Sequence, residues 1–423
     1  MKYNPFRPNG IVAPGMFVGR IDELLTIEQC LHQARHGNPQ HFLIEGERGI
    51  GKSSLLFLGE HIAKGTVNPI TAGASTMKFL TVSVDMGGVE TQLDIVRAIA
   101  RQLKQSLALR DALKEKALKV WEFISKWEVA GVRYHAENEG DSEDARDELV
   151  NRLAELLADS QGEIEGVFII IDEADAPPEG ARLGEFLKLF TERLSRRGCN
   201  LVLLGLAGLP STIPKLRASH ESAPRLLEVM PLDPLTGDER KQVVRRGLEE
   251  AEKINNFKTE IDDDAISLIA DLSEGYPHFI QQFSYCAFSE DNDNKINATD
   301  VTRGAYKDNG ALMQLGHKYF TELYKRRIAS DDYRTVLAAM AKHGDEWLTS
   351  KQITDESKEL GVSSTNVTNA LAALKDRNII LRDDSRRGFY KLPTKSFAAW
   401  INAIRALQFK SDTNVDLFGT PSE

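Results

Sequence analysis

One segment of the chain has the composition and spacing of a phosphate-binding loop. Residues 46–53, GERGIGKS, match the pattern GxxxxGK[ST]. They follow an apolar stretch at 42–44 and precede an apolar, helix-like stretch at 54–57, which is the context that the pattern requires. The glycines would turn backbone N–H groups toward phosphate oxygens, and the N-terminus of the following helix would add positive potential. The flanking patterns therefore favour a phosphate site over a chance glycine turn.

The side chains of this loop indicate which groups it contacts. Lys52 would reach the β- and γ-phosphates of a nucleotide, and the Ser53 hydroxyl would hold Mg²⁺. We therefore predict an ATP–Mg²⁺ site. Its predicted loop residues are Gly46, Gly49, Ile50, Gly51, Lys52, Ser53 and Ser54.

A second segment supplies two carboxylates. Residues 167–171, VFIII, predict a strand buried on both faces, and Asp172 and Glu173 follow at its C-terminal end. Carboxylates in that place are costly unless they bind a cation or a water molecule. Asp172 would orient Mg²⁺ and Glu173 would activate the attacking water, so the pair predicts hydrolysis as well as binding. A pair of strand-end acids at a solvated edge is the alternative.

The four letters DEAD at 172–175 also occur in a class of helicases. A helicase of that kind needs a second domain that closes on the nucleotide and carries its own arginine motif. The sequence predicts a helical domain and a winged helix instead, so we reject the helicase interpretation.

The pattern around the two motifs predicts the elements that hold them. From Phe17 to about Pro231, short apolar runs alternate with helical periodicity, which indicates an α/β domain with a parallel sheet. The acidic stretch Ala136–Asp147 is predicted as a solvated loop before a helix. The predicted strands are His41–Glu45, Phe79–Asp85, Val167–Asp172, Leu201–Leu206 and Leu227–Met230, and 91–107 is a predicted helix.

Two further patterns follow toward the C-terminus. Residues 236–327 lose the strand pattern, and a capping box at Thr236 and a proline at Pro277 each predict a helix start. Three helices at 333–343, 349–360 and 363–378, then strand-like segments at 379–381 and 388–392, have winged-helix order. We therefore predict a P-loop ATPase α/β domain at 1–234, a helical lid at 235–328, a winged helix at 329–410 and a flexible tail at 411–423.

Composition limits the function classes. Of 423 residues, 41% are hydrophobic and 27% charged, and no apolar run approaches the roughly 20 residues of a membrane span. The first residues lack an apolar signal segment, and Cys30, Cys199 and Cys286 have no metal-site spacing. We expect a cytoplasmic protein without membrane contact. The net charge is −10, yet 331–410 carry 13 Lys and Arg against 10 Asp and Glu, which is compatible with a local DNA contact.

With these motifs placed, the segment FVGRIDEL at 17–24 is informative. It resembles the FVGR-x-x-EL motif that AAA+ and STAND ATPases carry before the first strand, where it helps to form the adenine pocket. The order of motifs, lid and winged helix resembles archaeal-type ATPases and origin-recognition/initiator ATPases from Phe17 to Trp400. The resemblance implies a P-loop NTPase fold of the additional-strand type, with Phe17, Val18, Gly19 and Arg20 at the nucleotide.

The resemblance also implies residues at the γ-phosphate and at a subunit contact. His278, in the segment GYPH at 275–278, stands at the lid position of a sensor motif and would approach the γ-phosphate, with packing as the alternative. Arg225 stands where an arginine finger would project to a neighbouring subunit; Arg217 is its rival, and a surface ion pair is the alternative for both. The fourth strand lacks the usual polar sensor residue at its end, and Asn200 precedes it, which favours slow hydrolysis.

The predicted winged helix would carry base contacts in the first turn of its third helix. Ser364 and Asn366 have suitable side chains there, and Arg382, Arg386 and Arg387 in the hairpin would contact phosphates. Double-stranded DNA is therefore the predicted partner. Against this, the first turn has no Arg or Lys and the second helix is acidic, so a protein partner stays open.

The sequence supports a leading hypothesis and an alternative. In the first, a slow ATPase of AAA+/STAND type is a molecular switch that couples nucleotide state to DNA binding or assembly through the winged helix. In the second, ATP drives self-assembly of a signalling or regulatory protein whose winged helix docks a protein. A small-substrate kinase is the weakest hypothesis, because nothing resembles an acceptor-substrate pocket.

Overall fold

The computed structural model describes residues 2–110, 139–160, 162–322, 324, 328, 330–383 and 385–413. The chain folds as two compact units. Residues 11–233 form one of them, and 1–10 together with 234–423 form the other. The phosphate loop and the two strand-end carboxylates therefore belong to the first unit.

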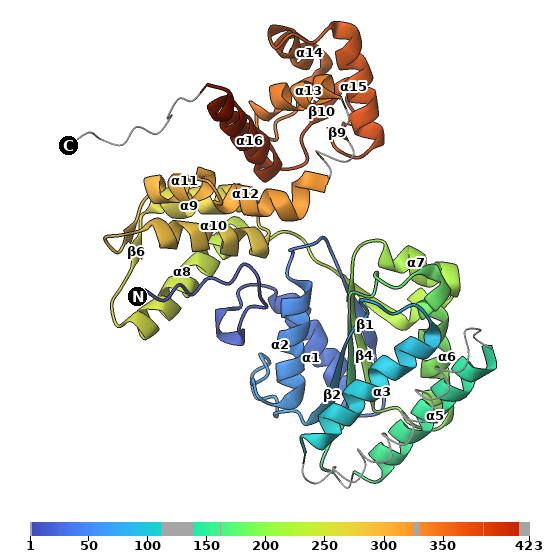
Figure 1. Cartoon of the computed structure of the whole chain (residues 1–423). Helices are drawn as coiled ribbons and strands as arrows, with labels where there is room; N and C mark the ends of the chain where they lie inside the picture. The colour runs from blue at the N-terminus through green and yellow to red at the C-terminus, as the bar shows by residue number, and fades with distance from the viewer. Residues whose placement is uncertain are drawn as a thin grey trace. The chain divides into compact units, whose positions relative to one another are not determined.

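A five-stranded parallel sheet forms the centre of the first unit (Figure 1). Its strands are β1 (His41–Glu45), β2 (Phe79–Asp85), β3 (Gly166–Asp172), β4 (Val202–Gly208) and β5 (Leu227–Pro231), in the order β2-β3-β4-β1-β5. β4 therefore lies between β1, which precedes the phosphate loop, and β3, which ends in Asp172. This inserted strand confirms the predicted additional-strand fold, and β1 and β2 have the predicted bounds.

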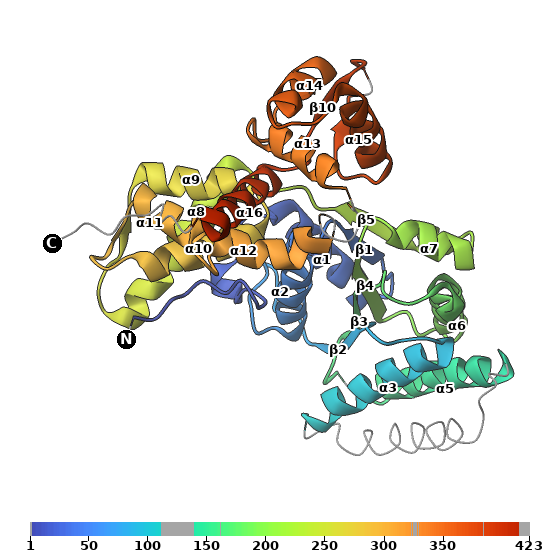
Figure 2. The same ribbon diagram turned by 45° about the horizontal axis from the view of Figure 1, so that its top comes forward.

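Helices cover both faces of this sheet. They are α1 (Ile21–Arg35), α2 (Lys52–Lys64), α3 (Gln92–Ala108), α5 (Glu139–Ala158), α6 (Leu183–Arg196) and α7 (Thr212–Ser219), with short helices η1 (Pro14–Met16), η3 (Glu179–Ala181) and η4 (Ala223–Leu226). α1 and α2 pack on one face, and α3, α5 and α6 on the other (Figure 1). α3 and α5 lie side by side in both views (Figure 2).

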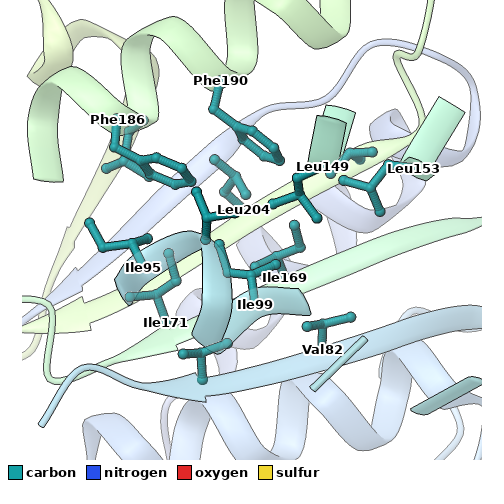
Figure 3. Packing of buried hydrophobic residues seen from close by; sticks show 14 of the residues in the cluster. Val82, Ile95, Ile99, Leu149, Leu153, Ile169, Ile171, Phe186, Phe190 and Leu204 are labelled. Atoms are coloured by element: carbon teal, nitrogen blue, oxygen red, sulfur yellow. The ribbon is translucent and has the colours of Figure 1, made fainter. Parts of the chain in front are cut away.

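The core on the second face explains why the strands have continuous apolar sequences. Ile169 and Ile171 of β3 and Leu204 of β4 meet side chains from α3, α5 and α6 (Figure 3). Those partners are Ile95, Ile99, Leu149, Leu153, Phe186 and Phe190, and all nine side chains are at most 1% exposed. Burial of each such side chain contributes about 1.5–3 kcal/mol to the stability of the folded state. The packed core therefore holds the carboxyl ends of the strands rigidly in place.

The prediction of a solvated loop at Ala136–Asp147 is wrong from residue 139 onward, because α5 begins at Glu139. Residues 136–138 lie outside the described part of the chain. Two of the acids that suggested a loop form ion pairs with another helix: Arg193 of α6 pairs with Glu143 and Asp147. Ala145, between them, is fully buried. One face of the acidic stretch therefore packs on the core, and the other carries ion pairs.

The second unit begins with a helical part. Its elements are α8 (Gly237–Asn255), β6 (Glu260–Ile261), α9 (Asp263–Ser273), α10 (Pro277–Glu290), β7 (Lys295–Ile296), α11 (Ala298–Tyr306), α12 (Ala311–Leu315) and the π-helix η5 (Gly316–Phe320). The capping box at Thr236 and the helix start at Pro277 confirm two predictions. The short parallel pair β6–β7 was not predicted, because two residues are too few for a periodic pattern.

The C-terminal part of this unit contains helices and short strands in the order that the sequence predicted, and its assignment as a winged helix stays a prediction. It contains α13 (Asp331–Ala341), β8 (Leu348–Thr349), α14 (Ser350–Glu359), α15 (Ser364–Asp376), β9 (Leu381–Arg382), β10 (Phe389–Lys391) and α16 (Lys395–Thr413). The strands form an antiparallel sheet in the order β8-β10-β9. Residues 411–413 of the predicted tail belong to α16, and 414–423 lie outside the described residues.

The first residues of the chain pack in this second unit, which differs from the predicted α/β domain at 1–234. The Asn255 side chain bonds the backbone of Tyr3 in both directions, at 2.8 and 3.0 Å. The Arg7 N–H donates to Gln281 at 2.8 Å, and Phe6, 2% exposed, packs edge-on against Phe288. Backbone hydrogen bonds and a buried ring therefore fix this segment, which the sequence suggested was only an extended lead-in.

Glu274 joins the helical part of this unit to α16. It ends α9 in a left-handed conformation (φ 52°), and its carboxylate accepts the Ser396 N–H at 2.5 Å. Burial raises the pKa of Glu274 to about 7; Ser396 and Lys395 lower it and Asp345 raises it. The pKa of Glu274 is about 7 in the folded protein and 4.5 in the unfolded chain. Between these pH values the folded protein therefore binds more protons than the unfolded chain. Stability therefore falls as pH rises from about 4.5 to about 7.

We expect Glu274→Gln to remove this pH dependence, because the amide oxygen still accepts the Ser396 N–H but carries no charge. Relative to the unsubstituted protein, the variant should gain about 1–3 kcal/mol of unfolding free energy between pH 5 and pH 8. Urea unfolding at the two pH values measures this difference, with the exposed Glu249→Gln as control. Parallel pH profiles for Glu274→Gln and the unsubstituted protein would show that Glu274 does not ionise in this range.

Candidate functional site

The phosphate loop connects β1 to α2 at the carboxyl edge of the sheet. Gly49 has φ 80° and Gly51, the N-cap of α2, has φ 103°, conformations that an L side chain rarely adopts. The first bond of the helix runs from the Leu55 N–H to the Gly51 carbonyl. The earlier N–H groups of α2, including those of Lys52 and Ser53, have no intrahelical partner and suit an anion.

Lys52 folds back over this loop. Its Nζ donates to the carbonyls of Gly46 and Glu47 at 2.8 and 3.0 Å. Burial lowers the pKa of Lys52, and the nearby carboxylates of Asp175 and Asp172 oppose that effect. The ammonium group is therefore held at the loop by neutral carbonyls, which a phosphate oxygen can replace.

Three strand-end acids stand at the same edge of the sheet. Asp172 ends β3 and pairs in register with Asp85, which ends β2. Glu173 follows in a left-handed conformation (φ 52°), and its N–H donates to Asp172 Oδ1 at 2.9 Å. Burial and the charges of Asp85, Asp172 and Asp175 raise the pKa of Glu173, and Arg48 of the phosphate loop lowers it. A raised pKa suits a carboxylate that accepts a proton near neutral pH.

The predicted metal ligands fit Mg²⁺ bound with a nucleotide. Ser53 is in the first turn of α2, and Asp172 is at the end of β3. No group of three or more His, Cys, Asp or Glu side chains within the described residues is arranged to hold a metal ion. Mg²⁺ commonly binds through one or two protein ligands, waters and substrate phosphates, so this sparse ligand set agrees with such a site.

The FVGR segment contacts the phosphate loop through Arg20. Gly19 and Arg20 have positive φ values, and Arg20 is the N-cap of α1. The guanidinium group donates to the Ile50 carbonyl at 3.5 Å and to the Asp233 carbonyl, and it pairs with Glu23 at 3.3 Å. Val18 is buried and Phe17 half-buried. The structure thus brings the segment that resembles an adenine-binding motif to the loop.

The two arginine-finger candidates lie on the surface of the same unit. Arg225 is in η4 and Arg217 in α7, and both are exposed. Neither has an ion-pair partner among the residues that the structure describes, whereas a surface ion pair was the alternative interpretation of each. Which of them contacts a neighbouring subunit stays a prediction.

His278 belongs to the second unit and packs in an aromatic cluster there. Its ring lies 5.4 Å from that of Tyr319 and 6.3 Å from that of Phe279. Its buried Nε2 has no hydrogen-bond partner within the described part of the chain. Burial, with Lys318 nearby, lowers the pKa of His278 to about 4. The side chain is therefore uncharged at neutral pH, and its predicted role at the γ-phosphate stays a prediction.

The predicted DNA-contacting residues belong to two segments of the C-terminal part. Ser364 and Asn366 are exposed in the first turn of α15, and the Asn366 amide donates to Asp332 of α13 at 2.6 Å. Arg382 in β9 and both Arg386 and Arg387, in the turn before β10, are exposed as well. Arg386 stacks 4.6 Å from the centre of the Phe389 ring and bonds Asp383 at 2.6 Å.

Three further residues lie near the predicted site residues and were not predicted from the sequence: Asp85, Arg48 and Asp175. Asp85 ends a strand whose bounds were predicted, and the signal that could have found it is an acid at the end of a second parallel strand. Arg48 lies within the phosphate loop at a position that the motif leaves open. Asp175 was noticed only as the last letter of DEAD.

Three comparisons place this arrangement among known proteins. Residues 16–204 match the family described as AAA ATPase domain. A curated protein of Methanocaldococcus jannaschii, named an uncharacterized HTH-type transcriptional regulator, is 25% identical over 292 residues, which are 66% of this chain and 65% of that protein. The chain thus matches less than two thirds of the length of that relative.

Two solved structures share the fold of this chain. The Walker-type ATPase of Pyrococcus abyssi has a TM-score of 0.51 at 18% identity, over 91% of this chain and 96% of that one. The ORC2 protein of Aeropyrum pernix, in ADPNP–ADP complexes, has a TM-score of 0.55 at 14% identity, over 97% and 99% of the two chains. In the described part of our chain, no helix has the length and apolar character that crossing a membrane requires.

We expect Lys52→Ala to weaken ATP–Mg²⁺ binding by about 100-fold or more, because a charge-assisted hydrogen bond to phosphate is worth up to about 3 kcal/mol. Isothermal titration calorimetry measures the affinity. Lys64→Ala, at the opposite end of the same helix, is the matched control and should bind as the unsubstituted protein does. Equal affinities for the two variants would place the nucleotide elsewhere.

Proposed function

We propose that this chain, whose residues 16–204 match the family described as AAA ATPase domain, is a switch that binds ATP with Mg²⁺, hydrolyses it slowly and couples its nucleotide state to DNA binding or assembly through the C-terminal winged helix. One observation carries this proposal. The phosphate loop after β1 and the acids that end β3 lie at the same edge of one parallel sheet, with β4 between them.

The reaction follows from the roles that these residues would take. The loop N–H groups and Lys52 would bind the β- and γ-phosphates, and Ser53 and Asp172 would hold Mg²⁺, which offsets charge on the phosphates. Glu173 would accept a proton from water as the water oxygen attacks the γ-phosphorus. The bond from that phosphorus to the bridging oxygen then breaks, which leaves ADP and phosphate.

Slow turnover is part of the proposal, and it rests on the end of β4. The last residues of this strand are Leu206, Ala207 and Gly208, all of them buried and without a polar side chain. No β4 side chain can therefore hydrogen-bond the γ-phosphate or the attacking water. A site that lacks such a donor loses part of the electrostatic stabilisation of the transition state.

Assembly would supply a cation from a second copy of the chain. Arg225 is exposed in η4, just before the start of β5, and Arg217 is exposed in α7, and a neighbouring subunit could receive one of them. An arginine of one copy that contacts the γ-phosphate of ATP bound to the neighbouring copy would raise the rate of ATP hydrolysis above that of the isolated chain. ATP-dependent self-assembly is therefore expected to accompany turnover.

The distribution of charge supports a DNA contact through the hairpin of the winged helix. Residues 377–391 carry five Lys and Arg against two Asp and Glu, net +3. Lys391 and Arg386 lie over the ring of Trp347, at 5.2 and 5.7 Å from its centre. A basic hairpin supported by aromatic rings suits a phosphate backbone, and the regulator name of the Methanocaldococcus relative agrees with such a role.

A specific observation favours the alternative, in which the winged helix docks a protein. Residues 331–376, which include α13 to α15, carry five Lys and Arg against eight Asp and Glu, net −3. Asp332 also binds the Asn366 amide, at the turn where base contacts were predicted. An acidic surround disfavours insertion of α15 into a DNA groove, so a protein partner is the second candidate.

We expect Glu173→Gln to bind ATP within about threefold of the unsubstituted affinity and to lose turnover by about 100-fold or more, because the amide cannot accept the proton of the attacking water. Phosphate release under saturating ATP measures turnover. The exposed Glu179→Gln, six residues further along, is the matched control. An unchanged rate for Glu173→Gln would mean that another group is the base.

We expect duplex DNA binding that depends on nucleotide state and weakens with salt. Replacement of Arg382 and Arg387 together by Ala should lower the slope of log affinity against log salt by about 2, since each phosphate contact contributes about 0.9. Fluorescence anisotropy with a labelled duplex, with ADP or a non-hydrolysable ATP analogue, measures the slope. Arg386 is left in place because it is paired with Asp383.

The matched control for that experiment is the double replacement of Arg245 and Arg246, two exposed arginines of α8 in the same unit. It removes the same charge from the helical part and should leave the slope unchanged. If no DNA binds in any nucleotide state while ATP still increases the particle size in light scattering, the protein-docking alternative replaces the DNA proposal.

A further inference from the structure

The connection after β3 holds an unusual backbone conformation at the candidate base. Glu173 has φ 52°, a left-handed conformation that costs a non-glycine residue free energy and persists only where neighbouring groups enforce it. Two backbone bonds take part: the Ala174 N–H donates to the Ala207 carbonyl of β4 at 2.9 Å, and the Ala176 N–H donates to the Glu173 carbonyl at 2.8 Å. The connection is therefore a tight turn held against β4.

Hydrogen bonds of Asp175 also hold this turn in place. Its Oδ1 accepts the N–H of Leu209, the residue that follows β4, at 2.9 Å. Its backbone carbonyl accepts a hydrogen bond from Lys215 Nζ of α7 at 2.5 Å, and the same ammonium group lies 3.5 Å from the Pro177 carbonyl. The turn thus has bonds to β4, to the residue after β4 and to α7.

The end of β4 is shaped to receive the Asp175 carboxylate. A Cβ atom at Gly208 would lie 2.1 Å from Thr212 Oγ1 and 3.3 Å from Asp175 Oδ1, so no side chain fits there. Thr212 is fully buried, and its hydroxyl donates to the Leu209 carbonyl at 2.7 Å. Asp175 and Thr212 therefore occupy the space that a side chain at position 208 of β4 would need.

We propose that Asp175 is a positioning residue for ATP hydrolysis, which fastens the connection after β3 to the end of β4 and so holds Glu173 in its left-handed conformation beside the phosphate loop. This inference rests on the proposed function. Asp175 acts through Glu173 and touches no reacting atom. Its contribution is therefore to turnover and not to nucleotide affinity.

The experiment compares Asp175→Ala and Asp175→Asn in steady-state ATP hydrolysis. Asp175→Ala loses the bond to the Leu209 N–H, and we expect kcat to fall about 10–100-fold while KM for ATP stays within about threefold, because displacement of a catalytic group of about 1 Å costs rate and not binding. Asp175→Asn keeps an oxygen that accepts this N–H, so kcat should return to within about threefold of the unsubstituted value. Glu179→Ala, an exposed acid four residues away, is the control.

Each other outcome overturns the inference in a distinguishable way. An unchanged kcat in Asp175→Ala shows that the turn holds Glu173 without this bond. An Asn variant as slow as the Ala variant shows that charge matters and the bond does not, and a large rise in KM shows direct nucleotide contact. If Asp175→Ala does not fold, Lys215→Met removes the second bond to the same turn, and it should lower kcat several-fold at constant KM.

The unsubstituted protein separates this inference from the proposed function. If it hydrolyses ATP and Glu173→Gln does not, the proposed function stands, and the Asp175 variants alone decide the role of the turn. If the unsubstituted protein has no turnover at all, with or without DNA, the proposed function and the positioning role fall together.

Discussion

The candidate site depends on one property of parallel sheets: the carboxyl ends of neighbouring strands meet at a single edge. The phosphate loop and Asp172 are far apart along the chain, and only the strand order brings them to the same edge. β4 also sets their spacing. Two steps between neighbouring strands, each about 4.8 Å, leave about 10 Å between β1 and β3. That width accommodates phosphate groups together with a metal ion and a water molecule.

The same edge concentrates negative charge. Asp85, Asp172 and Asp175 raise the pKa of Glu173, and Arg48 is the cation that lowers it. The charges of Asp172 and Asp175 also act on Lys52. ATP would add further negative charge to this place. Binding of the nucleotide and of Mg²⁺ should therefore be strongly coupled, because Mg²⁺ reduces the repulsion between the carboxylates and the phosphates, and the phosphates attract Mg²⁺. The proposed switch would then respond to the nucleotide–metal complex and not to either component alone.

Much of the fold could be predicted from the sequence, because strands buried on both faces have continuous apolar runs that begin and end sharply. β1 and β2 have the predicted bounds, and β3 begins one residue earlier. α5 was mistaken for a loop because an arginine that pairs with two of its acids, Arg193, comes from a different helix. The nucleotide and DNA contacts themselves stay predictions.

The roles of Asp85 and Asp175 could not be predicted for a related reason. Asp85 matters because β2 pairs with β3, and Asp175 because a carboxylate meets the N–H of a residue beyond β4. Neither relation leaves a spacing pattern in the chain, since both join segments that are distant in sequence. Motif spacing finds residues that act from one segment, and it misses residues whose role comes from a partner strand.

The packing of residues 2–10 in the second unit has a mechanical consequence. The chain leaves that unit after Gly10, forms the first unit over 11–233, and returns at Pro234. Two covalent connections therefore join the units, where a simple linear order of domains would give one. Cleavage of the chain at 233–234 alone would therefore not free the first unit, because it would stay joined to residues 1–10, which are bonded within the second unit.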